Sequence, residues 1–174
     1  YMRLVAINKA LGRSEPTFSD GFLIDSTPPE VTDVYFKYGA YTPTTNEIEV
    51  GWYVTENAAE ITTLNVELLE INGNNKIKID DAVFTDLPRF SYTFTGLNLT
   101  HNKTYVVSMN ALNEIGLISD SILSEPIRID TTEPIKPTTI DDGIFTSRNY
   151  EITVSLTNGS DDESGVKGYN YFIL

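Results

Sequence analysis

The feature that most constrains this chain is an internal repeat. The segment from Ala6 to Pro29 matches the segment from Ala111 to Pro134 at a constant separation of 105 residues, through apolar, polar and proline positions alike. A second pair of segments, 48–52 and 152–156, matches at 104 residues. A repeat of this length indicates a series of similar modules, each about the size of a small domain. The interpretation is the end of one module plus linker at residues 1–29, a complete module plus linker at 30–134, and the start of a third at 135–174. This last segment is expected to supply three strands, of which one includes 152–156 and the next runs through Tyr169, Tyr171 and Ile173.

The junctions between these modules are rich in proline. Pro28-Pro29 closes the first linker, and Pro134 and Pro137 lie in the second. Proline fixes its own φ and donates no backbone hydrogen bond, so such linkers are short, extended and semi-rigid. Because residue 1 falls within a strand-like segment and residue 174 ends one, we expect a longer parent chain. The alternative is strand exchange between copies, which would complete the partial modules head to tail.

Residues 30–134 alternate apolar and polar side chains, which is the period of a β-strand. A turn sequence at 72–75 separates two such segments and indicates a hairpin. Seven short strands in about 100 residues, without a helical period, predict an all-β fold of tandem immunoglobulin-like, seven-stranded β-sandwiches. The expected inward or strand-forming positions are Val31–Tyr35; Ile48, Val50, Trp52 and Val54; Leu64, Val66 and Leu68; Ile77 and Ile79; Phe90, Tyr92 and Phe94; Tyr105, Val107, Met109 and Ala111; and Ile127 with Ile129.

A late segment carries a family resemblance. Thr104-Tyr105-x-Val107-x-Met109-x-Ala111 follows Leu97 and resembles the late-strand signature of fibronectin type III domains. The resemblance implies a structural role for Tyr105, whose hydroxyl would bond backbone a few residues upstream, and for Trp52 in the core. The third module has Leu156 at the tryptophan position, which departs from the pattern. The acid-rich loop at 161–165 resembles repeats of very large modular surface proteins.

Composition excludes several functions. The net charge of −13 repels phosphate backbones, so nucleic acid is not an expected partner. No apolar run approaches the length of a membrane span. A catalytic nucleophile needs an adjacent base, and the chain has no cysteine and only His101, a loop residue. Paired carboxylates can hydrolyse a glycoside, but here the acids fall in turns of small modules that offer no deep cleft. We therefore expect no enzyme activity and no required cofactor.

Acidic side chains gather where the linkers meet the following module. A sandwich of this topology places the loop after its second strand at the same end as its N-terminus. Calcium takes six to eight oxygen ligands, and this end of each module supplies several carboxylates. A competing interpretation is that these acids are simply solvated. The candidate calcium ligands at the inter-module junctions are Asp25, Glu56, Asp130, Asp161, Asp162 and Glu163.

Three acceptor sequences for N-glycosylation fall in expected loops, where a glycan can project. They begin at Asn98, Asn102 and Asn158.

Two functions follow from this organisation. The first is a non-catalytic structural and adhesive spacer in an extracellular or cell-surface protein, with neighbouring modules of the same chain, other copies in a filament or other surface proteins as partners. The second is a carbohydrate- or protein-binding module, accessory to a secreted enzyme in one version, which uses the loop tyrosines Tyr38 and Tyr41 as anchors.

Overall fold

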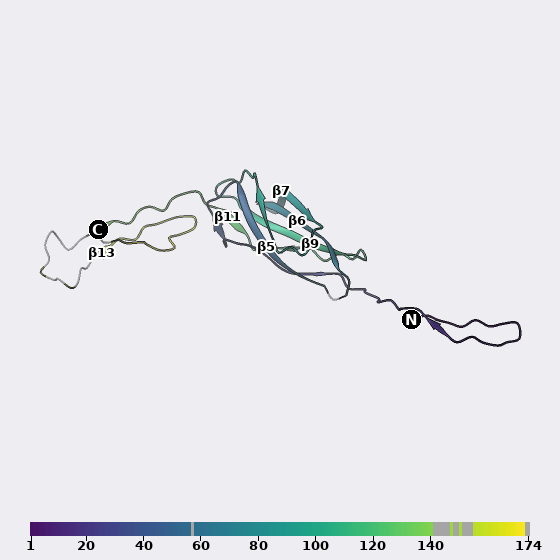
Figure 1. Ribbon diagram of the computed structural model, residues 1–174. Coiled ribbons are helices and arrows are strands. Elements are labelled where there is room, and N and C mark those ends of the chain that lie inside the picture. Colours follow the sequence, from purple (N-terminus) through teal and green to yellow (C-terminus); the bar gives the residue numbers. More distant parts are fainter. Residues whose placement is uncertain (57, 141–146, 148–149, 151–154, 173–174) are drawn as a thin grey trace.

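The computed structural model describes residues 1–56, 58–140, 147, 150 and 155–172. Every regular element in these residues is a strand, which confirms the all-β class. No helix in the described part of the chain is long and apolar enough to cross a membrane. An N-terminal hairpin and the segments that follow the second linker lie at opposite ends of a central sandwich, so the molecule is elongated (Figure 1).

The smaller sheet of the sandwich has three antiparallel strands in the order β3-β5-β8. Val34 on the first strand lies opposite Trp52 on the second, and Val50 lies opposite Tyr92 on the third. Alternation places one side of this sheet in the core and the other in solvent. Its strands are β3 (Glu30–Phe36), β5 (Glu47–Thr55) and β8 (Ser91–Thr95).

The larger sheet has the order β4-β11-β9-β6-β7, and β10 also pairs with β9. The expected hairpin turn forms, with Asn72 opposite Asn75 and a positive φ of 61° at Gly73. The strands are β4 (Tyr41–Thr42), β6 (Ile61–Asn72), β7 (Asn75–Phe84), β9 (Thr104–Asn113), β10 (Ile122–Leu123) and β11 (Ile127–Ile129).

The nine strands of the sandwich correspond to seven in the expected pattern. The first strand is divided into β3 and β4, because the chain turns at Gly39 (φ 84°) and crosses to the other sheet, where β4 runs parallel to β11. The last strand is divided into β10 and β11 on either side of Pro126, which cannot donate to a ladder. Residues 30–130 therefore form a seven-stranded β-sandwich of the fibronectin type III kind.

The core lies between the two sheets. Trp52, Phe94 and Tyr105 are each 1% exposed or less, and the Trp52 indole donates a hydrogen bond from Nε1 to the Arg89 carbonyl at 2.8 Å. Ile77 and Ile79 lie in β7 as expected but are 46% and 38% exposed. The strand position predicted for Phe90 is wrong, because Phe90 lies outside β8 and is 67% exposed. It precedes β8 and lies where the chain crosses between sheets, so the alternation of that strand does not extend to it.

The N-terminal hairpin reproduces the hydrogen bonds of the sandwich's last hairpin at the same 105-residue separation. It consists of β1 (Arg3–Leu4) and β2 (Thr17–Phe18). The Ala6 amide donates to the Ser14 hydroxyl at 3.0 Å, as the Ala111 amide donates to the Ser119 hydroxyl at 2.9 Å. Two further equivalent bonds run from Met2 N to Ser19 Oγ and from Val107 N to Ser124 Oγ.

The described residues after the second linker pair as β12 (Thr139–Ile140) with β13 (Ser155–Leu156). Most of the strand expected at 152–156, and Ile173, lie outside the described residues. A third strand through Tyr169 and Tyr171 was also expected, but residues 161–172 contain no strand, and these tyrosines are 44% and 87% exposed. In the complete module the corresponding strand, β6, is held by β7 and β9, and the described residues offer it no such neighbours.

Candidate functional site

The second linker begins with a turn built on a buried aspartate. Asp130 is only 6% exposed, and its Oδ1 accepts hydrogen bonds from the Thr132 amide at 3.0 Å and the Thr132 hydroxyl at 2.7 Å. Hydrogen bonds from the Ser164 hydroxyl and then from Thr132 lower the pKa of Asp130 from 3.8 to about 2. Asp130 is therefore an anion that other groups hold in place from two sides.

The acidic loop of the following segment meets this turn. Carboxylate oxygens of Asp130, Asp161 and Glu163 all lie within 4.8 Å of one another. Asp161 Oδ1 organises its loop by accepting from the amides of Ser164 at 2.7 Å and Gly165 at 2.9 Å. The Thr132 hydroxyl also lies 3.2 Å from Glu163 Oε2. The linker and the loop are thus joined through shared side chains.

The chain's single histidine lies at the same junction. His101 Nδ1 accepts a hydrogen bond from the Thr131 amide at 3.2 Å, and its Nε2 lies 3.9 Å from Glu163 Oε1. Its role at the junction depends on how the loop after β8 meets the linker, which no local pattern indicates.

The first linker repeats the aspartate turn. Asp25 Oδ1 accepts from the Thr27 amide at 2.9 Å and the Thr27 hydroxyl at 2.8 Å, and these bonds lower the pKa of Asp25. Its other oxygen, Oδ2, is buried and has no hydrogen-bond partner of ordinary geometry within the described part of the chain. At the separation of 104 residues that holds for this part of the repeat, Ala59 corresponds to Glu163, so the third carboxylate has no equivalent at this junction.

The structure therefore brings together some of the predicted ligands and separates others. Asp130, Asp161 and Glu163 converge, whereas the exposed Asp162 is not part of that group. Among the described residues, Asp25 and Glu56 belong to no cluster of three acids. Calcium binding by Asp130, Asp161 and Glu163 stays a prediction. Asp130, Asp161 and Glu163 would supply three oxygens, half or fewer of those that calcium takes.

The predicted anchors Tyr38 and Tyr41 lie beside this junction. They are 67% and 42% exposed, and they line a groove of about 610 Å³ together with Asp130, Asp161 and Lys167. The two tyrosines thus lie on the sandwich's side of the junction.

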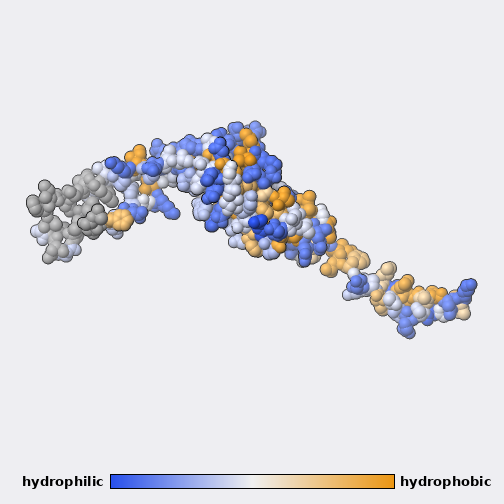
Figure 2. Space-filling view, turned by 45° about the horizontal axis from the view of Figure 1, so that its top comes forward, coloured by the Kyte–Doolittle hydropathy of each residue, from blue (hydrophilic) through white to orange (hydrophobic). Residues whose placement is uncertain are grey.

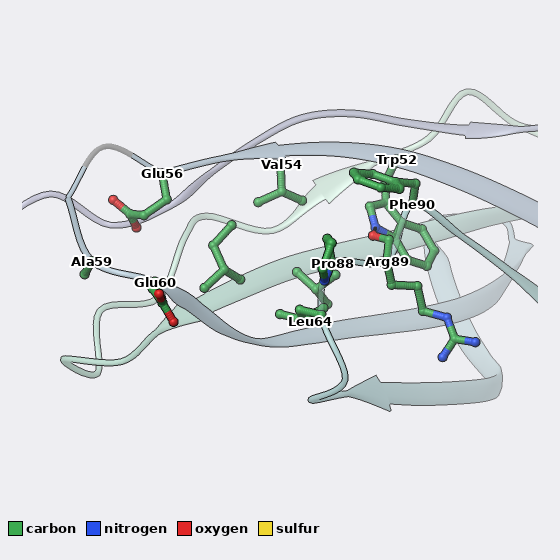
Figure 3. Close-up of a pocket in the computed structure, with 11 residues that line it drawn as sticks. Trp52, Val54, Glu56, Ala59, Glu60, Leu64, Pro88, Arg89 and Phe90 are labelled. Carbon is green, nitrogen blue, oxygen red and sulfur yellow. Dashed lines mark hydrogen bonds between the residues drawn. The ribbon is translucent and has the colours of Figure 1, made fainter.

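A second cavity, of about 430 Å³, opens between the sheets at the sandwich's other end. Figure 3 shows Trp52, Pro88 and Leu64 along its length, with Glu56 and Glu60 at one end and Arg89 near the other. Asn113 Nδ2 donates to Glu56 Oε2 at 3.3 Å. The Arg89 guanidinium lies 4.5 Å from the centre of the Phe84 ring, so its charge makes a cation–π contact with the protein.

The linker before the sandwich exposes an apolar run. Phe22, Leu23 and Ile24 are each at least 78% exposed, and Figure 2 shows this hydrophobic stretch between the hairpin and the sandwich.

The three candidate glycosylation sites are accessible. Asn98, Asn102 and Asn158 are all exposed, and none lies in a strand. Asn102 has a positive φ of 69° and its side-chain oxygen accepts a hydrogen bond from Arg128.

Comparison with known proteins gives structural likeness only. No protein-family model matches the chain, and no curated protein matches it. Among solved structures, titin module A71 from human cardiac muscle is 21% identical over 61% of this chain and 93% of that one, with a TM-score of 0.43. The twitchin kinase region from C. elegans is 17% identical over 73% of this chain, with a TM-score of 0.44, and this chain spans 19% of its length. The chicken interferon gamma receptor alpha chain is 18% identical over 74% of this chain and 64% of that one, with a TM-score of 0.39.

The strand order of the sandwich, with β3-β5-β8 facing β4-β11-β9-β6-β7, defines its class. The middle of the chain is a fibronectin type III-like β-sandwich.

Proposed function

We propose that this chain is a segment of a serial array of fibronectin type III-like modules that acts as a semi-rigid spacer in an extracellular or cell-surface protein. The observation that carries the proposal is the repeated junction. Asp25 with Thr27 and Asp130 with Thr132 make the same pair of hydrogen bonds 105 residues apart. Because both linkers form the same aspartate–threonine turn, we expect the modules to follow one another in a regular orientation and not on flexible tethers.

Contacts across the second junction support a fixed orientation. Thr132 and His101, on the sandwich's side, both contact Glu163 of the following segment. Asp130 is buried at the same point, and Ser164 reaches it from the following segment. These five side chains contact one another across the junction, and together they restrict rotation about the linker more than proline alone.

Backbone relaxation measured by NMR tests the spacer. We expect order parameters of about 0.85 for the amides of Thr131 and Thr132, equal to those of the strands, because both amides donate hydrogen bonds to side chains. Values below about 0.6 at these amides, with rigid strands on either side, would mean a flexible tether and would contradict the proposal.

A divalent cation at the junction is the second part of the proposal. The converging oxygens of Asp130, Asp161 and Glu163 favour it, because three carboxylates within 4.8 Å repel one another unless a cation or a proton separates their charges. Calcium bound there would draw the linker and the loop together and stiffen the array. Glycans on Asn98, Asn102 and Asn158 would be compatible with a surface location, as would adhesion to other surface proteins.

A further inference from the structure

Two tyrosine rings form a platform on the solvent face of the smaller sheet. Tyr35 on β3 and Tyr53 on β5 have ring centres 6.0 Å apart and ring planes inclined by only 30°. They are 38% and 56% exposed. Neither residue belongs to the core, and neither lies at a junction, so the spacer function does not account for them.

A glycine makes the platform flat. Gly51 lies opposite Tyr35 in the register of β3 and β5, and a Cβ at Gly51 would come within 2.6 Å of the Tyr35 Cζ and Oη atoms. The ring therefore lies over the backbone of β5 with one face against the sheet. A hydrogen bond with the Tyr53 hydroxyl raises the pKa of Tyr35, so the two phenols also meet at their polar ends.

Polar groups surround the platform. Ser91 on β8 lies opposite Gly51, and Asp33 on β3 lies opposite Tyr53. The nearby lysine, Lys37, is held by Glu49 through bonds of 2.8 and 2.7 Å. The rim thus offers hydroxyl and carboxylate groups, while its cation is already engaged.

We propose that the Tyr35–Tyr53 platform binds a neutral polysaccharide, with sugar rings stacked on the tyrosines and sugar hydroxyls bonded to the rim. The C–H face of a pyranose ring is weakly positive and apolar, and it complements the negative face of an aromatic ring. Two rings lying side by side at 30° form an extended surface for successive sugars, whereas an organic cation is best held by rings that surround it. The chain's charge of −13 repels uronic-acid and sulfated glycans, which leaves the neutral ones.

The binding test uses the full chain and a panel of neutral oligosaccharides: cellohexaose, xylohexaose, mannohexaose and chitohexaose. We expect at least one of them to shift the Tyr35 and Tyr53 ring signals in NMR titration. Tyr35→Leu and Tyr53→Leu should each weaken that binding at least tenfold, because leucine keeps apolar area but has no flat face. Tyr171→Leu, a change at an exposed tyrosine outside the platform, should bind like the wild type.

A second variant keeps both tyrosines. Gly51→Ala places a methyl group where the Tyr35 ring lies, so the ring must lift and binding should fall at least fivefold. Failure of all four sugars to shift the rings, or binding that survives both leucine variants, would overturn the proposal. Ring shifts with an arginine–glycine repeat peptide and none with the sugars would also overturn it, in favour of a basic protein partner. The spacer proposal is unaffected by either result.

Discussion

Tyr105 provides the sharpest single-atom test of the sandwich. Its side chain is 1% exposed, and its hydroxyl accepts a hydrogen bond from the Thr100 amide at 3.0 Å, five residues upstream. Tyr105→Phe removes only this acceptor and leaves the ring in the core. A polar group left without a partner costs about 1–3 kcal/mol. Because Thr100 is at the surface and water can reach part of its surroundings, we expect a loss of about 1–2 kcal/mol in the free energy of unfolding.

The assay is thermal and urea unfolding of the full chain. For a module of this size, such a loss lowers Tm by roughly 5–15 °C. The control is Tyr38→Phe, which removes a hydroxyl from a side chain that is 67% exposed and should change the free energy of unfolding by less than about 0.5 kcal/mol. Equal effects of the two substitutions would refute the reasoning that the Tyr105 hydroxyl fixes the loop before β9.

Three further predictions concern the core and the junction. Trp52→Ala should lower the free energy of unfolding by about 3–5 kcal/mol, since it empties the centre of the core and removes the bond to Arg89; a loss below about 1 kcal/mol in urea unfolding would argue against that position. The folded-state pKa of Asp130, about 2, lies below the usual 3.8, so the stability that its carboxylate contributes is present above pH 4 and is lost as the pH falls towards 2. The Tm difference between the wild type and Asp130→Asn should therefore shrink as the pH falls from 4 towards 2. A difference that stays constant over this pH range would count against the lowered pKa of Asp130. Calcium should raise the wild-type Tm above its value in chelator, and the rise should be modest because it grows with the logarithm of the ion concentration. Asp130→Asn should abolish this rise, whereas Asp162→Asn should retain it. Equal Tm values of the wild type in calcium and in chelator would exclude the site.

Much of the sandwich could be predicted from sequence, because its strands alternate strictly. Ile48, Val50 and Trp52 define the core face of β5 without any knowledge of their partners. Phe90 fits the same alternation but lies one residue before β8, and only the path of the crossing segment shows that it faces solvent. The division of the first strand at Gly39 was also missed, since a positive φ there redirects the chain to the other sheet.

The sites depend on contacts between distant segments, and sequence reasoning found only part of them. It identified the acidic loop but could not choose between Asp162 and its neighbours, because that choice follows from the turn around Asp161. The choice of Tyr38 and Tyr41 as anchors stays a prediction, and no sequence pattern indicated the pairing of Tyr35 with Tyr53. Their pairing requires the register of β3 against β5, which includes an irregularity between Val31 and Asp33.

A distance measurement across the second junction tests the spacer most directly. The chain has no cysteine, so spin labels can be attached to two introduced ones, Lys76→Cys on β7 and Lys167→Cys in the following segment, both at exposed positions. A fixed junction predicts one narrow distance distribution by double electron–electron resonance, and Glu163→Gln should broaden it by removing the carboxylate that Thr132 and His101 share. A broad distribution in the wild type, unchanged in the variant, would show that the modules move independently and would contradict the semi-rigid array.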